Sequence, residues 1–587
     1  MSTDPTDRIV RAIQGAVAPA PEPLDRADAL GQLPPDEFTD GFDDGDAPSD
    51  VGLDKVDGDL VKACAGLDHS DTDNGERLRR HFGQDLAVMA QEGTAGGDWL
   101  CWTGTHWDLA AGAARARLIV QKLGGRIGLE ANHLQMTPEE AKRIKAGKKA
   151  EKIAEDQRTP DDRKAIERKA AVEKGFEARQ SRRRAFAVTS KNKARMEAAL
   201  ECAAPHLRRM PDLFNPGRVK FATQTHTIHL SRVVDDECED DTVTRFRATL
   251  HAEPGHRRDD WITSVVPTNY DPEATAPRWR AFMEEMMPDA EKRRTVQQFA
   301  GLGLLAVPVQ NVMFHYGLGA NGKSVFLETV CRLLGPGLAV GLPRESIVGG
   351  SERAAGGASP DIVRLYTKRL VRITELKADV PLQEDLIKRL TGGEPMPVRT
   401  LFKGYFEFQN FATPHMSGNG FPTIDGTDHG IWRRLLIVHW DQTMPPERQR
   451  DFEEFVSEFV VEEGPGVLNW LIEGALDFYA HGLYVAPAVR ASTDEYREEM
   501  DPIGEFLNTC VRKADGLRVQ ANDMYQAYVS WSLANAKRAR TQTKFGKELG
   551  KRFQKSEIEG RNWYQDVELH SVPLRPIEPR NPDNYGS

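Results

Sequence analysis

The stretch Val312–Ser324, V-M-F-H-Y-G-L-G-A-N-G-K-S, decides the fold of this chain. It is an apolar run that opens into a glycine-rich loop and ends in Gly-Lys-Ser, the pattern G-x-x-x-x-G-K-[ST]. The glycines let backbone N–H groups curl around phosphates, the lysine reaches the β- and γ-phosphates, and the serine hydroxyl is a ligand for Mg²⁺. The residue spacing predicts a buried strand over Asn311–Tyr316 and a helix over Lys323–Leu334. This segment therefore predicts an α/β fold that binds ATP and Mg²⁺.

The loop pattern also defines the nucleotide contacts that we expect. A glycine turn between two core elements is the structural alternative, and the strand and helix patterns on either side argue against it. The expected contacts are Gly317, Gly319, Ala320, Asn321, Gly322, Lys323, Ser324 and Val325.

A nucleotide hydrolase also needs a carboxylate at a strand end, to hold the metal or polarise the attacking water. The β-prone run Leu370–Glu375, L-V-R-I-T-E, lies about 50 residues after Lys323 and ends in such a carboxylate. We therefore expect Glu375 to polarise the attacking water and, together with Ser324, to bind the metal. Asp379 is a second candidate for this carboxylate. A surface glutamate at a strand end is the structural alternative.

Two further catalytic positions follow along the chain. Asn419 comes directly after another strand-like run, where an amide can orient the attacking water or sense the γ-phosphate. Arg433 and Arg434 precede the apolar run Leu435–Val438, and such arginines can reach the nucleotide of a neighbouring subunit as arginine fingers.

Between these motifs, Val398–Phe408 predicts a β-hairpin with its turn at Lys403-Gly404. Arg399 and Lys403, flanked by aromatic residues, suit the gripping of a nucleic-acid backbone. An ordinary exposed lysine in a β-turn gives the same pattern.

Charge is distributed unevenly along the chain. Residues 1–60 contain 15 acidic and 4 basic side chains, and we interpret residues 1–70 as an acidic disordered tail. Residues 141–200 contain 19 Lys and Arg against 9 Asp and Glu, and their composition predicts long helices. This basic segment either follows a nucleic-acid backbone or is a solvated helical face, and the sequence leaves both readings open.

We expect an α+β domain over residues 71–295, the ATPase domain over 296–485, a small unit over 490–570 and a tail over 571–587. In the first, Asp98–Leu109 predicts a hairpin whose tryptophans are core residues or a base-stacking platform. The small unit reads as three helices and a hairpin, the order of a winged helix. Its expected DNA contacts are Lys544, Lys547, Lys551 and Arg561.

Other functions are disfavoured by what the sequence lacks. No segment approaches the roughly 20 apolar residues of a membrane span. The six cysteines are scattered, which favours a reducing cytoplasm and argues against a structural zinc site. No set of strand-borne carboxylates suits two-metal nucleotidyl transfer, so we do not expect primase activity from this chain.

The order of these motifs resembles a superfamily III helicase of the AAA+ type, and among those the phage and plasmid primase-helicases, which include the poxvirus primase-helicase. Asp71–Glu76, Val266–Pro272 and Thr543–Leu549 extend the resemblance outward from Tyr316–Val438. Glu394, where the family often has Asp, and the lead Pro414-His415-Met416 before Asn419 depart from its pattern.

The resemblance implies an ATP-driven ring, usually a homo-hexamer, that moves on single-stranded DNA and separates strands at a fork. The ATP site would lie between subunits, and Lys403 would line the pore. A separate primase or replication protein would act with it, in the cytoplasm of a bacterium or a phage-infected cell. The alternative is a DNA-binding assembly protein, switched by ATP for origin binding or defence, that does not unwind.

Overall fold

The strand that leads into the glycine loop lies inside a parallel sheet in the computed structural model of the chain. The structure describes residues 55–90, 97–215, 219–234, 246–349, 360–378, 380–399, 405–424, 429–537 and 539–572. Strand β9 (Val312–Tyr316) lies between β14 (Thr413–Gly418) and β15 (Leu435–His439), and the sheet continues from β14 to β11 (Leu370–Leu376) and β10 (Ala339–Leu342). All neighbouring strands are parallel, which confirms the predicted α/β class.

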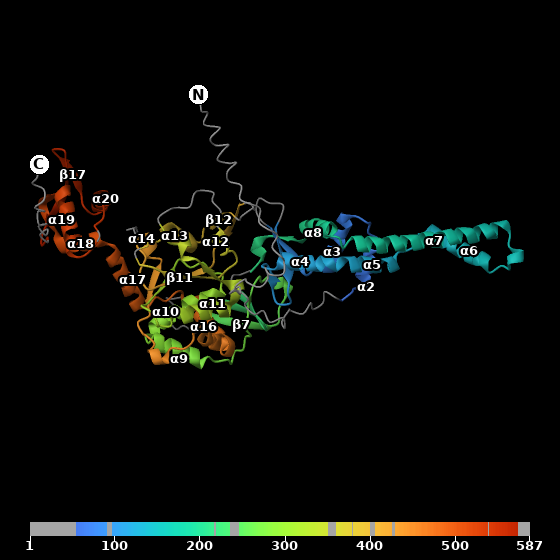
Figure 1. Cartoon of the computed structure of the whole chain (residues 1–587), viewed down its shortest axis with the longest axis horizontal. Helices are drawn as coiled ribbons and strands as arrows, with labels where there is room; N and C mark the ends of the chain where they lie inside the picture. The colour runs from blue at the N-terminus through green and yellow to red at the C-terminus, as the bar shows by residue number, and fades with distance from the viewer. Residues whose placement is uncertain are drawn as a thin grey trace, which may run out of the picture. The chain divides into compact units, whose positions relative to one another are not determined.

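Both faces of this sheet are buried, as is usual for parallel sheets. Side chains alternate along β9, so that Met313 joins one hydrophobic core while Val312 and Phe314 join the other. The first face is covered by α9 (Pro277–Met286), α10 (Ala290–Gly301), α11 (Lys323–Leu338) and α16 (Gly464–His481), and the second by α12 (Pro360–Val363), α13 (Glu384–Gly392) and α14 (His429–Trp432) (Figure 1). Helices α15 (Phe452–Ser457) and α17 (Pro487–Met500) complete this part.

Helix α11 begins at the predicted residue. It runs from Lys323 to Leu338 but kinks at Gly335, whose φ is 71°, and Pro336 follows. The regular helix therefore ends where the sequence predicted, at Leu334.

A second sheet shares a core with these helices. It has the order β7-β6-β5-β8, with β5 (Lys220–Thr223), β6 (His226–Val234), β7 (Phe246–Pro254) and β8 (Val265–Val266). Its side chains Phe221, Ile228 and Leu230 belong to the same cluster as Phe326 of α11 and Leu471 of α16. The core around the parallel sheet therefore includes residues well before 296, the domain boundary expected from the sequence.

The N-terminal part has a four-stranded sheet covered by helices. Its strands have the order β3-β2-β1-β4, namely β1 (Leu86–Ala90), β2 (Gly97–Trp102), β3 (Trp107–Asp108) and β4 (Arg208–Arg209). The predicted tryptophan hairpin is present, with Trp102 paired to Trp107. Trp107 is buried and stacks on Trp261 at 4.8 Å, so it is a core residue rather than an exposed stacking platform.

The helices of this part are α2 (Gly58–Cys64), α3 (Asp71–Phe82), α4 (Gly112–Gln121), α5 (Leu123–Glu130), α6 (Pro138–Glu151), α7 (Pro160–Thr189) and α8 (Lys193–Leu207). Helix α2 corrects the expectation of a disordered tail up to residue 70. Asp57 caps its first turn, and Val61 and Cys64 are buried. Residues 1–54 lie outside the described residues, so the rest of that expectation stays a prediction.

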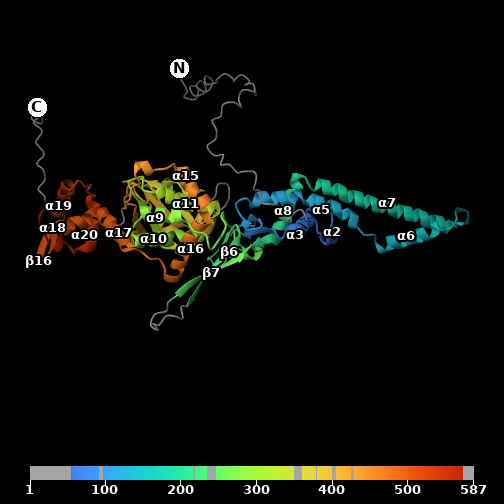
Figure 2. The same cartoon turned by 90° about the horizontal axis from the view of Figure 1, so that it is seen from below.

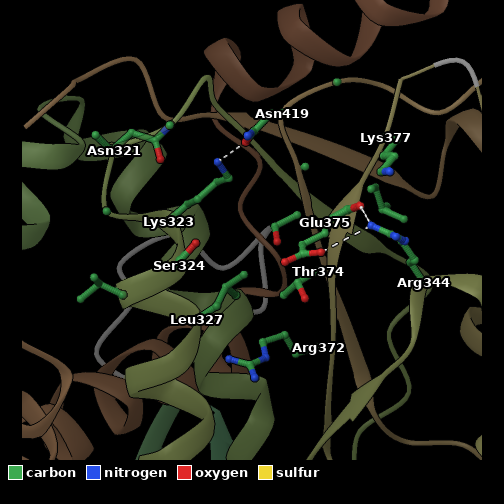
Figure 3. A pocket seen from close by; sticks show the side chains of 18 of the residues that line it. Asn321, Lys323, Ser324, Leu327, Arg344, Arg372, Thr374, Glu375, Lys377 and Asn419 are labelled. Carbon is green, nitrogen blue, oxygen red and sulfur yellow. Dashed lines mark hydrogen bonds and ion pairs between the residues drawn. The ribbon is translucent and has the colours of Figure 1, made fainter. Parts of the chain in front are cut away.

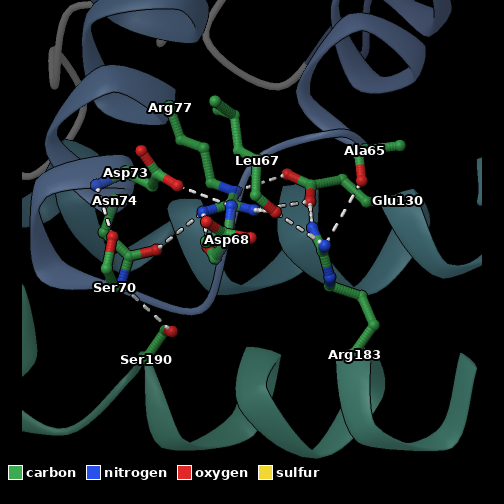
Figure 4. A network of polar contacts seen from close by, with 10 residues as sticks. All are labelled: Ala65, Leu67, Asp68, Ser70, Asp73, Asn74, Arg77, Glu130, Arg183 and Ser190. Carbon is green, nitrogen blue, oxygen red and sulfur yellow. Dashed lines mark hydrogen bonds and ion pairs between the residues drawn. The ribbon is translucent and has the colours of Figure 1, made fainter. Parts of the chain in front are cut away.

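The motif Asp71–Glu76 begins α3 and has a structural role. Its Asn74 is buried and donates to Ser190 Oγ at 3.3 Å, and a side chain at Gly75 would collide with Cys202 of α8. One turn later Arg77 forms a fully buried ion pair with Glu130, with 2.8 Å between Nε and Oε1, and Arg183 of α7 joins it (Figure 4). The motif therefore fixes the packing of α3, α5, α7 and α8.

The C-terminal unit has the predicted three helices and hairpin, plus a strand that the sequence did not predict. The elements are α18 (Pro502–Cys510), β16 (Val511–Gln520), α19 (Ala521–Ala534), α20 (Gln542–Arg552), β17 (Lys555–Ile558) and β18 (Arg561–Leu569). Strand β16 pairs with β18 in a sheet of order β16-β18-β17. Among the described residues, no helix has both the length and the apolar character needed to cross a membrane.

Candidate active site

A cavity of about 860 Å³ opens at the carboxyl edge of the parallel sheet. The loops that follow β9, β11 and β14 form its walls, because these three strands are neighbours and run in the same direction. The cavity therefore brings together Lys323, Ser324, Glu375 and Asn419, which are separated in sequence (Figure 3).

The glycine loop adopts a conformation that needs small residues. Gly319 and Gly322 have φ of 119° and 78°, and Ala320 also has a positive φ of 47°. A Cβ at Gly322 would lie 2.9 Å from the side chains of Phe282 and Met286. Of the expected nucleotide contacts, all but Gly317 line the cavity directly.

Gly317 instead lies at the start of the loop, where it is in close contact with the Asn321 side chain. A Cβ there would lie 1.8 Å from Asn321 Nδ2, which donates to the Trp440 carbonyl at 3.3 Å. The loop is also held at Ala320, whose carbonyl accepts from Met444 N at 2.7 Å. The loop is thus fixed to the segment that follows β15.

Lys323 is held in place by two acceptors. Its Nζ donates to Asn419 Oδ1 at 2.6 Å and to the Gly317 carbonyl at 2.9 Å. The side chain is buried, and this burial lowers the pKa of Lys323. A phosphate in the cavity would restore the favourable environment of the charged form.

Glu375 reaches the cavity through an irregularity in β11. The pairing of β11 with β14 shifts between Ile373 and Leu376, and Glu375 has a φ of 62°, which is rare for a residue with a side chain. Such bulges redirect side chains next to functional sites. The Glu375 side chain is 82% exposed, so its oxygens are accessible from the cavity. The Ser324 hydroxyl and this carboxylate are oxygen donors of the kind that Mg²⁺ prefers.

The cavity is also lined by three cations that the sequence analysis missed, Arg344, Arg372 and Lys377, and the first of these contacts Glu375. Arg344 follows β10, the next strand beside β11, and lines the cavity. Its Nη1 lies 3.2 Å from the Glu375 carbonyl and 3.4 Å from Glu375 Oε2 (Figure 3). It also pairs with its neighbour Glu345 at 3.0 Å. No motif surrounds Arg344 in the sequence, so only the strand order reveals its position.

The two arginines before β15 have different environments. Arg434 is buried, and its Nε donates to Thr391 Oγ1 at 3.0 Å while Nη1 donates to the Gly430 carbonyl. Arg433 is exposed. Both precede β15, so they lie at the amino edge of the sheet, opposite to the cavity. Arg434 is thus held by contacts within its own chain, and the arginine-finger prediction stays with Arg433.

The predicted DNA contacts fall in two places. Strands β12 (Pro395–Arg399) and β13 (Tyr405–Gln409) form the expected hairpin, in which Arg399 pairs with Tyr405 in register. Its tip, which contains Lys403, lies outside the described residues, as does Asp379. In the C-terminal unit, the predicted contacts all lie exposed, on α20 and at the start of β18: Lys544, Lys547, Lys551 and Arg561.

Two buried histidines, His315 on β9 and His415 on β14, are joined by a hydrogen bond. Trp440 Nε1 donates to His315 Nδ1 at 3.1 Å, so the proton of His315 is on Nε2, which lies 3.2 Å from His415 Nδ1. Both rings are fully buried. Burial lowers the pKa of His315 and lowers that of His415 to about 3, so both are neutral at physiological pH. His415, which departs from the family pattern before Asn419, thus has a structural role: it contacts His315 across the neighbouring strands β14 and β9.

Two family models match parts of the chain on either side of the cavity residues. Residues 75–288 match the family described as "D5 N terminal like", and residues 498–571 match the family described as "Poxvirus D5 protein-like". The chain is therefore a distant relative of the D5-type primase-helicases, which confirms the resemblance read from its motifs.

Two curated relatives of the chain are named as a helicase and a primase. The chain is 24% identical over 272 residues to "Putative helicase L207/L206" of Acanthamoeba polyphaga mimivirus, which is 43% of this chain and 28% of that protein. It is 21% identical over 270 residues to "Putative primase C962R" of African swine fever virus, again 43% of this chain and 28% of the relative. The aligned region thus spans less than a third of each curated relative. Because one of them is named as a primase, the comparisons do not support the expectation that this chain lacks primase activity.

Among solved structures, the chain is similar to the C-terminal region of NrS-1 in its apo form. That match has a TM-score of 0.34 and 10% identity, and it covers 58% of this chain and 96% of the other.

Proposed function

We propose that this chain is an ATP-dependent DNA helicase of the AAA+ type that moves along single-stranded DNA as a homo-hexameric ring during replication. The observation that carries the proposal is the convergence of Lys323, Ser324, Glu375 and Asn419 on one cavity at the carboxyl edge of a parallel sheet. This is the set of groups that phosphoryl transfer from a nucleotide to water needs.

Each residue has a role that its position supports. Lys323 would bind the β- and γ-phosphates, and Ser324 and Glu375 would hold Mg²⁺, which neutralises charge that develops on the phosphates. Glu375 would also accept a proton from the attacking water, and Asn419 would orient that water. Arg433 would contact the nucleotide of the next subunit in the ring.

DNA would be held by two basic surfaces of the ring. The β12–β13 hairpin carries Arg399 and Lys403 and would face the central pore. The C-terminal unit, whose helix-strand-helix-helix-hairpin order supports a winged helix, would add α20. Lys544, Lys547 and Lys551 share one face of this helix because they are three and four residues apart, while Phe545 and Leu549 face the core.

The test is a comparison of the wild type with Lys323→Ala, using ATP hydrolysis and the unwinding of forked DNA as readouts. We expect the variant to lose both activities, whereas Lys193→Ala, at an 86% exposed lysine far along the sequence, keeps both. Imaging with a non-hydrolysable ATP analogue should show six-fold rings. A wild type that hydrolyses ATP without separating strands would contradict the helicase and favour an ATP-switched assembly protein.

A further inference from the structure

Helix α6 and the residue that follows it carry five exposed lysines on one side of the helix. Lys142, Lys145, Lys148, Lys149 and Lys152, which directly follows the helix, are all exposed. At 3.6 residues per turn they fall within about 120° of the helix circumference, so they form one face. We call these five residues the α6 lysine face. In the described part of the chain none of them forms a hydrogen bond or ion pair, although Lys149 lies near enough to Asp162 to lower the pKa of that carboxyl.

Two of the three acidic residues of α6 are turned toward α7, and the third, Glu139, is exposed in the first turn. Glu140 forms a two-bond pair with Arg179 of α7, at 2.6 and 2.7 Å, and Glu151 pairs with Lys169 of α7 at 2.6 Å. These carboxylates therefore hold α6 on α7 and do not neutralise the lysines on the opposite face.

The direction of the lysine face is fixed by close packing. Gly147 is buried, and a Cβ there would lie 2.4 Å from Lys169 Cβ and 2.9 Å from the Ala165 carbonyl, so α6 and α7 touch at this glycine. Capping boxes at Thr137 and Thr159 begin both helices. Figure 2 shows α6 lying alongside α7. By helical periodicity, the five lysines lie on the side of α6 opposite to Gly147. The face is thus part of a rigid element rather than of a flexible tail.

Helix α7 provides an internal comparison. Its exposed residues also include cations, among them Arg163, Arg168 and Lys174, but exposed Glu167 lies four residues after Arg163 and exposed Glu177 three residues after Lys174. Mixed charges of this kind are typical of a solvated helix surface. From Lys142 to Lys152 the α6 lysine face has the same exposure and its only intervening carboxylate, Glu151, pairs with Lys169 of α7; Glu139 lies one turn before the face. This contrast separates it from an ordinary solvated surface.

We infer that the α6 lysine face binds the phosphate backbone of a nucleic acid, at a site separate from the ATPase ring and independent of nucleotide. Lysines spaced three and four residues apart lie roughly 4.5–6 Å apart along the helix axis and can each neutralise one phosphate. Flexible ammonium groups without aromatic neighbours recognise charge rather than base sequence. The face carries no apolar side chain that could enter a lipid layer, which argues against a membrane partner.

The experiment uses the full-length chain without nucleotide and a fluorescent single-stranded oligonucleotide, with anisotropy measured over a series of salt concentrations. The test variant replaces four lysines by glutamine: Lys142, Lys145, Lys148 and Lys152. The matched control replaces four cations of α7 by glutamine: Arg163, Lys164, Arg168 and Lys174. Exposed glutamine keeps good helix propensity, and circular dichroism checks the fold of both variants.

We expect the α6 variant to bind at least about tenfold more weakly at 0.1 M salt, with a salt-dependence slope lower by roughly 3, since each contact to a single strand contributes roughly 0.7. The α7 control should keep most of the wild-type affinity and slope. Equal losses in both variants, or no loss in the α6 variant, would overturn the inference. Because nucleotide is absent, Lys323→Ala should bind like the wild type, so a failure of the helicase proposal is distinguishable from a failure here.

Discussion

Lys323 Nζ donates to Asn419 Oδ1 at 2.6 Å, which joins the glycine loop after β9 to the end of the neighbouring strand β14. The asparagine oxygen thus accepts one hydrogen bond from the ammonium group that we propose binds phosphate. A bound γ-phosphate would take over the lysine and release the amide to face the attacking water. Under the proposed function, the two residues would therefore couple nucleotide binding to the arrangement of the catalytic groups.

This link predicts the effect of Asn419→Ala. The variant should still bind ATP, because Lys323 and the loop backbone remain, but its kcat for hydrolysis should fall about a hundredfold, as for the loss of one preorganised polar group. Binding of a fluorescent ATP analogue and steady-state hydrolysis measure the two effects separately. Unchanged hydrolysis would show that Asn419 only positions the lysine in the empty site.

Arg344 yields a second prediction. Because its guanidinium contacts both the carbonyl and the carboxylate of Glu375, Arg344→Ala should leave that side chain without its neighbour and lower kcat by roughly tenfold, with little change in ATP affinity. Glu345→Ala removes the other ion pair of Arg344 and is the matched control, which should keep wild-type hydrolysis. If both variants behave alike, the arginine does not act through Glu375.

The sequence predicted those parts of the site that are marked by contiguous patterns. The loop at Gly317–Ser324 and the run that ends in Glu375 combine an apolar strand with a polar end, and both were placed correctly at the carboxyl edge of the sheet. Arg344 has no such pattern, because it belongs to a short turn after β10 and enters the cavity only through the order of the strands. Its role could not be inferred without the sheet topology.

Local composition explains why strand β16 was not predicted from the sequence. Strand β16 contains Lys513, Asp515 and Gly516, and its pairing with β18 shifts between Lys513 and Arg518. This irregular, largely exposed strand lacks the alternation by which a strand is recognised. The burial of Arg434 could not be predicted either, because a pattern of two adjacent arginines does not reveal which one is buried.

The two buried histidines predict a loss of stability in mild acid. Histidine in the unfolded chain has a pKa near 6.5, and that of His415 in the folded protein is about 3. Below pH 6.5 the unfolded chain therefore takes up the proton first, so acid favours unfolding; at pH 5 the cost is about 2 kcal/mol for this one residue. The thermal midpoint, followed by circular dichroism, should fall between pH 8 and pH 5. His415→Gln should reduce this fall, whereas His251→Gln, at an exposed histidine, should leave it as in the wild type.

The two arginines before β15 give the last prediction. Arg434→Ala should destabilise the chain by roughly 2–4 kcal/mol, since it removes a buried side chain together with its hydrogen bonds to Thr391 and Gly430. Arg433→Ala, at an exposed position, should leave the thermal midpoint unchanged but abolish ATP hydrolysis. Thermal unfolding and hydrolysis assays on the two variants separate these roles.

A mixing experiment then decides whether Arg433 acts on a neighbouring subunit. Arg433→Ala and Lys323→Ala should each be inactive alone, yet in mixed rings some interfaces pair an intact Lys323 with an intact Arg433 from the next subunit. With random assembly of equal amounts, about a quarter of the interfaces are complete, so hydrolysis should return to about that fraction of the wild-type rate. If Arg433 acted within its own chain, every subunit in the mixture would lack one of the two groups and no activity would return.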